Sequence, residues 1–567
     1  MGASTFTDVL DLPLFGDTDK PSWRGDVNGA NNKLEAAHNT TQGRIGDVEG
    51  RATVLEGRAD DLEDRTTDVA LAAQVAAWVK ANFNDVYASK YLPGAASDYA
   101  ALNLARDAAI ARKARLVIDD IGRDWVIDAS LTFDTLTDFS FHMEGRIKRA
   151  DAATRVSLIY IKNCVGFRAG VIRTNGNVAN NGYDFGAGVV PVDEAKHSVR
   201  IEGGSNIKIQ RTHAYNPAGD GVYIVSSANN VFINHSETVS DAATGRNTVS
   251  IVQGDNITIN SVVCRGTGYT TMPGGLDIEP NTGQTCSNIS IGTVDAQTQG
   301  TGGCTVVGAF TAAGVRQIKN VQIATVNLIK NAGVVTNATD VIVRGVVNCY
   351  IGKVSVTQDA ASTNVACAID DCDDVRLPNL DIPRAGKPMA IGTNAAVTNL
   401  FMRGRYISAS SHAISITALS DAEIDMQLRC LAVGGLLVVK QATGTSANVK
   451  FRGNWRKEAT AGTGVMQLNG TVSDWVMEGC DCTGWEAANR LVIGVGNDAF
   501  TTGIKRINCK GINYLTAAPT TNTGDSWAAG EIVWNSAPAA AGAPGWVCTT
   551  GGRYGTYIFK AMANLAA

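Results

Sequence analysis

The sequence predicts a mainly β protein: a right-handed parallel β-helix, preceded by a parallel coiled-coil stalk and followed by a small C-terminal β module. Three observations support this prediction. A short motif recurs after residue 200, a heptad pattern precedes it, and the composition is rich in glycine and poor in charge. The predicted divisions are an arm at 1–29, a coiled-coil stalk at 30–80, a neck and capping helix at 81–120, the β-helix at 121–515 and a tip module at 516–567.

The recurring motif is one polar residue followed by an apolar, a variable and an apolar residue. Its copies begin at Asn206, Asn230, Asn256, Asn288, Asn320, Asp340, Asp374, Asn399, Glu423, Asn448 and Asp474. Apolar alternation with a period of two predicts a strand with one buried face. Asn and Asp tolerate the left-handed backbone of a tight turn. One such strand and corner in roughly every 25 residues is typical of one coil of a solenoid.

The composition excludes several classes of protein. The chain has 567 residues with 60 glycines, 44% hydrophobic residues, 18% charged residues and a net charge of −5. Such a chain can bury a large core, and it lacks the basic field that neutralises nucleic-acid phosphates. No run of 18 apolar residues and no secretory signal is visible, so we expect synthesis in a cytoplasm without membrane insertion. The 12 cysteines lack zinc-site spacing, so we expect packed free thiols and no cofactor.

Two series of residues spaced by seven define the stalk. One consists of Leu34, Thr41, Val48, Leu55, Leu62, Val69 and Ala76, and the other of His38, Ile45, Ala52, Ala59, Thr66 and Ala73. This spacing is typical of a coiled-coil seam. Arginines at the g positions precede glutamates at the e positions by five residues, as in Arg44 and Glu49. This charge pattern predicts parallel self-association.

Shorter elements are expected at both ends of the β-helix. Ser97 and Asp98 can cap a helix over 99–113, and strands are expected at 115–118, 125–127 and 139–143. In the tip module, short apolar strands are expected around Trp527 and at 532–534, 546–547 and 557–559.

Several of these segments carry a family resemblance. The relevant stretches are the helix-then-strand pattern at 99–119, the coil segments 245–251 and 275–281, and the tip segments 530–535 and 545–550. The first three resemble the pectate-lyase-like β-helix superfamily. With the stalk and tip, the whole is similar to bacteriophage tailspikes and β-helical tail fibres. The resemblance implies a homotrimer in the virion, with the arm docked to other tail or baseplate proteins and a host surface glycan as ligand.

Candidate chemistry lies on three neighbouring predicted strands. Aligning 221–225, 247–252 and 275–279 places Tyr223, Ser250 and Asp277 on the outer face, and alternation places Glu279 there too. Two carboxyl groups two residues apart on one face are the minimum equipment of a glycosidase. The spacing does not choose between inversion and retention.

Further residues of nearby coils complete the predicted site. We expect Asp277, Glu279, Asp220 and Arg246 to act in catalysis, and Tyr223, Glu237, Asp241 and His213 to contact substrate. In a lyase, an arginine or Tyr223 would instead remove the proton. Catalysis, glycan binding without cleavage and a purely structural role all stay open at this point. The predicted function is that of a tail fibre or tailspike binding host polysaccharide, with or without depolymerase activity; the alternative is a structural or adhesive fibre.

Overall fold

A computed structural model gives the structure of the chain. It describes Glu35 and residues 85–151, 156–181, 196–241, 246–266, 274–298, 304–307, 316–330, 339–358, 364–432, 435–455, 464–470, 472–483, 493–494, 504–510, 512–519, 526–527, 529–553 and 557–564. The chain divides into two compact units, 1–84 and 85–567, and all described residues except Glu35 belong to the second. The predicted arm and stalk lie outside the described residues apart from Glu35.

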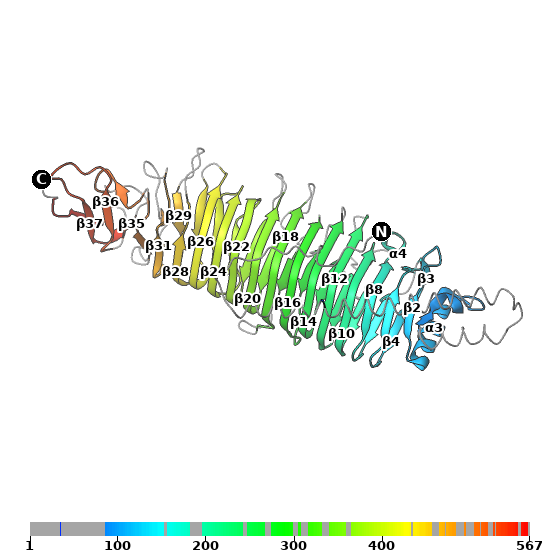
Figure 1. Ribbon diagram of the computed structural model, residues 1–567. Helices are drawn as coiled ribbons and strands as arrows, with labels where there is room; N and C mark the ends of the chain where they lie inside the picture. Colours follow the sequence, from blue (N-terminus) through cyan, green and yellow to red (C-terminus); the bar gives the residue numbers. More distant parts are fainter. Residues whose placement is uncertain are drawn as a thin grey trace, which may run out of the picture. The chain divides into compact units, whose positions relative to one another are not determined.

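Two long parallel sheets form the body of the second unit, as expected for a right-handed parallel β-helix (Figure 1). The described strands of sheet A are β1 Asp85–Tyr87, β2 Arg115–Ile118, β3 Trp125–Ile127, β5 Ser140–Met143, β6 Ile147–Arg149, β8 Arg168–Asn175, β10 Ser205–Tyr215, β12 Ala228–Ser240, β14 Gly254–Gly266, β16 Cys286–Thr298, β18 Ile318–Lys330, β20 Val346–Thr357, β22 Asp373–Ala385, β24 Val397–Ser408, β26 Leu419–Cys430, β28 Ser446–Arg452, β30 Val472–Ser473, β31 Trp475–Glu478 and β33 Ile504–Ile507. Those of sheet B are β4 Leu131–Asp134, β7 Ile159–Lys162, β9 Val199–Glu202, β11 Val222–Val225, β13 Val249–Ile251, β15 Leu276–Ile278, β17 Cys304–Val307, β19 Thr339–Arg344, β21 Val365–Asp370, β23 Met389–Ile391, β25 His412–Ile416, β27 Leu436–Lys440, β29 Gly464–Leu468 and β32 Ile493–Gly494.

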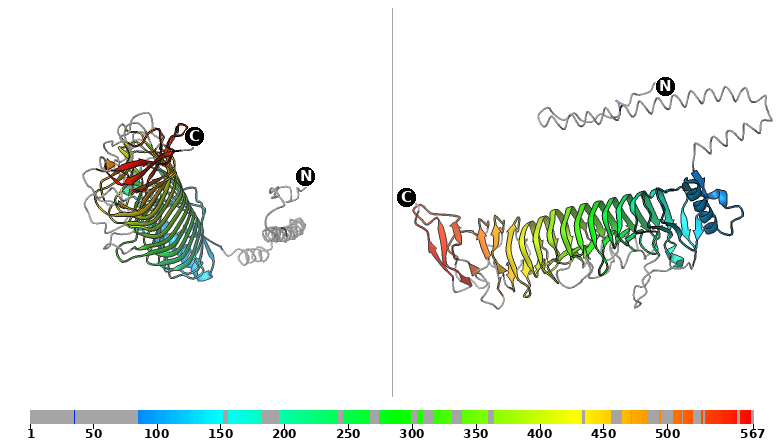
Figure 2. Two further views of the ribbon diagram at one scale, coloured as in Figure 1. Left: turned by 90° about the vertical axis from the view of Figure 1, so that its left-hand side faces the viewer. Right: turned by 90° about the horizontal axis from the view of Figure 1, so that it is seen from below.

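Each coil contributes one strand to sheet B and usually one long strand to sheet A, so like residues stack from coil to coil (Figure 2). On sheet B, Val222 pairs with Val249 and Val249 with Leu276, while Ile224, Ile251 and Ile278 form the next stack. All of these side chains are buried. The predicted inward stacking is therefore confirmed, and the core is a continuous apolar column between the sheets.

The polar corner of each coil lies near the start of its sheet A strand. Left-handed backbone angles occur at Asn206, Asn230, Asn256, Asn288, Asn320, Asn348, Asp374, Asn399, Asp421, Asn448 and Asp474. Nine predicted corners are confirmed, and two are wrong. Asp340 lies in β19 and Glu423 in β26, and the corners of those coils are Asn348 and Asp421. At both places a polar residue precedes an apolar alternation by chance. The local motif alone cannot distinguish such a residue from a true corner residue.

A helix lies at the N-terminal end of the β-helix. Helix α3 spans Asp98–Arg112, and the Ser97 side chain accepts a hydrogen bond from the Ala100 amide at 3.1 Å. Asp98 does not cap the helix; it pairs with Arg123 and accepts from the Val126 amide. The helix buries Ala101, Leu102, Ala105 and Ala109 in the same core as the strands, beside the short 3-10 helix η2 (Ala88–Tyr91). One further short helix is described, α4 (Val178–Asn181).

The tip module is antiparallel for the most part and packs on the last coil. Its strands are β34 Tyr514–Leu515, β35 Ser526–Trp527, β36 Ile532–Asn535, β37 Gly545–Thr550, β38 Gly552–Arg553 and β39 Ile558–Ala561. The expected strands are thus present. Trp527 and Tyr557 are buried and pack edge-on against Phe559.

All 12 cysteines are free thiols, and 11 of them are buried. This confirms the expectation of packed thiols. Over the described part of the chain, no helix has the length and apolarity needed to cross a bilayer.

Candidate functional site

Two polar columns run beside one another along sheet B. The first occupies the coil position two residues before each strand and contains His197, Asp220, Asn247 and Gly274; the second lies on the outer face of the strands and contains Arg200, Tyr223, Ser250 and Asp277. The predicted alignment of the last three residues is confirmed by the strand register. Both columns are largely buried here, so their polar groups depend on one another for partners.

Asp277 is the most strongly perturbed residue of these columns. Its side chain is 7% exposed, and its Oδ2 accepts a hydrogen bond from Asn247 Nδ2 at 3.0 Å. Its Oδ1 has no hydrogen-bond partner among the described residues. Burial, reinforced by the negative charges of Glu279 and Asp220, raises the pKa of Asp277 well above its usual range, against the opposing effect of Arg246. The surroundings of Asp277 therefore favour its protonated form, the form that a general acid needs.

Asp220 lies two coils before Asp277, and its pKa is shifted in the opposite direction. It is fully buried, with Arg246 Nε at 3.2 Å from Oδ1 and His197 Nδ1 at 3.1 Å from Oδ2. Burial works against ionisation, but Arg246 and His197 outweigh it and lower the pKa of Asp220. Because Asp220 is fully buried and ion-paired, it is closed to substrate and acts here on the charge balance around Asp277.

Asn247 joins the two carboxyl groups. Its backbone amide donates to Asp220 Oδ1 at 3.1 Å, and its side-chain amide donates to Asp277 Oδ2. The same side chain accepts a hydrogen bond from the Gly274 amide at 3.2 Å, which fixes its orientation. Asp220, Arg246, Asn247, Asp277 and Glu279 together form what we call the sheet B site.

Glu279 follows β15 directly and is exposed, in contrast to Asp277. Its negative charge contributes to the raised pKa of Asp277, so the two carboxyl groups lie close enough to interact electrostatically. The sheet B site therefore combines a buried carboxyl group of raised pKa with an exposed one. The sequence predicts both on the outer face, and the structure differs in that the side chains of the neighbouring coils cover Asp277.

Tyr223 contacts the neighbouring side chains through its aromatic ring. Its ring stacks on the His197 imidazole with 4.1 Å between centroids and 7° between planes, and only 7% of the residue is exposed. The Arg200 guanidinium lies 5.9 Å from the Tyr223 ring centroid. These contacts make Tyr223 a support for His197 and, through it, for Asp220.

The remaining predicted residues lie on another sheet. His213 on β10 pairs in register with Glu237 on β12, both in sheet A, whereas Asp277 belongs to sheet B. Glu237 accepts a hydrogen bond from Arg211 at 2.8 Å; burial opposes its ionisation, but Arg211 and His213 lower its pKa. Burial lowers the pKa of His213. Asp241 follows β12 and accepts a hydrogen bond from the Tyr215 hydroxyl.

Sequence reasoning missed His197 and Asn247 as members of the network. A signal was present, because both occupy the coil position of Asp220, two residues before the first inward residue of a strand. Finding them requires aligning the segments before the strands as well as the strands themselves.

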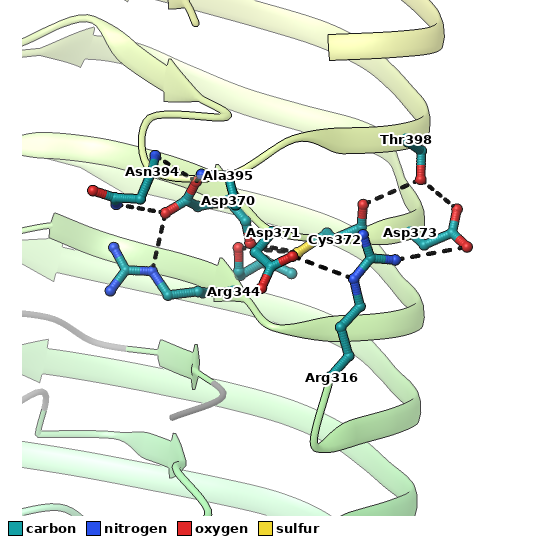
Figure 3. Close-up of polar contacts among 10 residues, drawn as sticks. Arg316, Arg344, Asp370, Asp371, Cys372, Asp373, Asn394, Ala395 and Thr398 are labelled. Carbon is teal, nitrogen blue, oxygen red and sulfur yellow. Dashed lines mark hydrogen bonds and ion pairs between the residues drawn. The ribbon is translucent and has the colours of Figure 1, made fainter. Parts of the chain in front are cut away.

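A carboxylate cluster further along the β-helix offers a contrast (Figure 3). Asp370 is 3% exposed, yet both of its oxygens have partners: the amides of Asn394 and Ala395 donate to Oδ1, and Asn394 Nδ2 donates to Oδ2 at 2.6 Å. Arg344 Nε lies 3.3 Å from the same Oδ2. Such a fully satisfied carboxylate links neighbouring coils, whereas Asp277 retains an oxygen without a partner.

Comparisons with known proteins give similarity at the level of structure only. No protein-family model matches the chain, and no curated protein matches it in sequence. Similar solved structures include a hyperthermoactive exopolygalacturonase from Thermotoga maritima, at 12% identity and a TM-score of 0.26, with 75% of this chain and 92% of that one covered. Another is an endo-xylogalacturonan hydrolase from Aspergillus tubingensis, at 11% identity and a TM-score of 0.22, with 72% and 88% covered. Any function must therefore be argued from the residues of this chain.

Proposed function

We propose that this chain is a phage tail fibre or tailspike that binds a host surface polysaccharide and hydrolyses it at the sheet B site. The observation that carries the proposal of hydrolysis is the buried Asp277, whose pKa is raised and whose Oδ1 has no partner among the described residues, beside the exposed Glu279. The heptad pattern of residues 30–80 supports parallel self-association, and the resemblance to tailspikes suggests that the assembly is a trimer. The arm at 1–29 is the proposed attachment to the rest of the tail.

In the proposed reaction Asp277 acts as the general acid. Its proton passes to the glycosidic oxygen as the bond between that oxygen and the anomeric carbon breaks. Glu279, as a carboxylate, either takes a proton from the attacking water or attacks the anomeric carbon itself, in which case water later releases the sugar. Asn247 acts as a positioning residue, because its side-chain amide holds the Asp277 carboxyl group by Oδ2. Oδ1 has no hydrogen-bond partner among the described residues but is itself buried, so the proposed proton transfer requires this oxygen to become accessible to substrate.

Release of new reducing ends from bacterial envelope polysaccharides tests the proposal. We expect the wild-type protein to cleave at least one of a panel of capsular and O-antigen polysaccharides, and Asp277→Asn and Glu279→Gln to lower the rate at least 100-fold, as is usual for loss of an acid or base. Asp381→Asn is the matched control, because Asp381 pairs with Arg405 on sheet A and should leave the rate unchanged. Retention of the rate by the Asp277 and Glu279 variants would refute the site.

A purely structural or adhesive fibre is the second candidate. The observation in its favour is that Asp220, Arg246, His197 and Asn247 link three successive coils by hydrogen bonds and ion pairs. On that account, Asp277→Asn changes stability alone, and no polysaccharide of the panel yields new reducing ends.

A further inference from the structure

A groove lies on the outer face of sheet A, away from the sheet B site. It encloses about 840 Å³ and crosses strands β20, β22, β24, β26 and β28, which lie side by side in Figure 1. Its lining includes one outward residue at the same position of each strand: Tyr350, Arg376, Phe401, Glu423 and Lys450. Strand register pairs each of the five with the next, so they form one column along the axis of the β-helix.

The aromatic members of the column are spaced for a repeating ligand. Tyr350 and Phe401 are two coils apart, or roughly 9.6 Å at one strand spacing per coil. Tyr350 is 39% exposed, and a Cβ on Gly352, two residues along its strand, would come within 3.3 Å of its ring. The absence of a side chain at Gly352 therefore lets the ring lie over the strand.

A second row of polar groups borders the groove. It consists of the corner residues Asp374, Asn399, Asp421 and Asn448, all with left-handed backbone angles. The corner geometry repeats once per coil, so side-chain amides and carboxylates recur at the same spacing as the column beside them. Such a row supplies hydrogen-bond donors and acceptors to a ligand that runs along the axis.

An irregularity in β22 lies at the same place. Leu377 pairs with Met402 but Leu380 pairs with Gly404, so β22 carries one extra residue against β24. Pro378 lies within this bulge and lines the groove. Proline is accommodated in sheets chiefly at edges and bulges, and bulges are frequent next to functional sites.

Of the charged residues that line the groove, all but Asp421 are ion-paired within the protein, and Asp421 accepts a hydrogen bond from Asn448 Nδ2 at 2.6 Å. Arg376 pairs with Asp374 at 3.0 Å, Lys450 with Glu478 at 2.5 Å, and Glu423 with Arg452 at 2.9 Å. A polyanion or a polycation would have to compete with these pairs, whereas hydroxyl groups can bond to them as they stand.

We infer that this groove binds a linear, uncharged polysaccharide that runs along the β-helix across the five strands. One sugar of an extended chain advances by a distance similar to one coil, so alternate sugars can stack on Tyr350 and Phe401. The intervening sugars then face Arg376 and the row of corner residues. The inference rests on the proposed function in taking a polysaccharide as the ligand. It adds where on the protein the polysaccharide binds and that the polysaccharide carries no charge.

Isothermal titration with neutral linear hexasaccharides tests the inference, using cellohexaose, xylohexaose, maltohexaose and mannohexaose, with hexagalacturonate as the charged comparison. We expect at least one neutral hexasaccharide to bind and hexagalacturonate not to bind. Binding should strengthen with length up to about five sugars, the span of five strands. Tyr350→Ala and Phe401→Ala should each weaken binding at least fivefold. Tyr514→Ala is the matched control, because Tyr514 is a tyrosine of similar exposure in the tip module.

The outcomes separate this inference from the proposed function. Asp277→Asn should abolish cleavage of a susceptible polysaccharide while leaving hexasaccharide affinity unchanged. If the Tyr350 and Phe401 variants bind like the wild type, or if no neutral hexasaccharide binds, the inference is wrong even where cleavage depends on Asp277. If binding depends on both rings and no polysaccharide is cleaved, the inference about the groove is supported and the proposed hydrolysis is refuted.

Discussion

The surroundings that favour the protonated form of Asp277, which the proposed chemistry needs, make the folded protein less stable at neutral pH. The Asp277 carboxyl group is buried beside two other acidic side chains, and only one of its oxygens has a partner. A residue placed for stability alone would be satisfied, as Asp370 is by the Asn394 and Ala395 amides. Groups that are held in an unfavourable state by their surroundings concentrate at functional sites, where stability and activity oppose one another.

This opposition predicts a dependence of stability on pH. The unfolded chain releases the Asp277 proton near pH 3.9, whereas the folded chain keeps it to a higher pH because the folded pKa is raised. The contribution of Asp277 to the free energy of unfolding is therefore largest below about pH 4 and falls as the pH rises through the folded pKa.

Asp277→Asn removes this titration and retains an oxygen for Asn247. We expect the variant to be more stable than the wild type at pH 8, by about 1.4 kcal/mol for each pH unit of the shift, and to lose this advantage at pH 4. Urea unfolding at the two pH values measures the difference. A variant that is less stable than the wild type at pH 8 would contradict the raised pKa.

At the scale of elements, the last coil and the tip module are joined by a buried ion pair. Arg506 on β33 forms two hydrogen bonds with Glu531, from Nε at 2.8 Å and from Nη2 at 2.6 Å, and its guanidinium lies 3.7 Å from the Trp527 ring centroid. Both charged side chains are almost fully buried. Removing one partner of such a pair leaves a buried charge uncompensated.

Glu531→Gln should therefore destabilise the junction by about 3–5 kcal/mol. We expect limited proteolysis to cut the variant near residues 516–530 while the β-helix survives, since sheets A and B do not depend on Glu531. Glu423→Gln is the matched control, because Glu423 is a partly exposed partner of Arg452 and its loss should cost no more than about 1 kcal/mol. Equal protease resistance of Glu531→Gln and the wild type would contradict the importance of this pair.

Elements with a regular period could be predicted from the sequence, and those defined by contacts between coils could not. The inward stack of Val222, Val249 and Leu276 follows from alternation alone and is confirmed. Asn348 was missed because its coil contains another polar residue, Asp340, before an apolar pair. The role of Asn247 depends on two bonds to different coils, a relation that no local pattern encodes.

For the whole molecule, one repeated coil provides both surfaces discussed above. Sheet B presents the carboxyl groups of the sheet B site, and sheet A presents the groove from β20 to β28. Because each coil adds a similar outer position at a fixed spacing, a solenoid suits a ligand that itself repeats. The predicted stalk would bring several such surfaces together in one assembly.

If Asp277 acts as a general acid on a polysaccharide, the pH dependence of cleavage must report its titration. We expect kcat/KM for a cleaved envelope polysaccharide to fall as the pH rises through the raised pKa of Asp277, and Asp277→Asn to abolish this limb together with at least about 99% of the rate. A rate that survives in Asp277→Asn with the same alkaline limb, or the absence of cleavage for every polysaccharide at every pH, would contradict it.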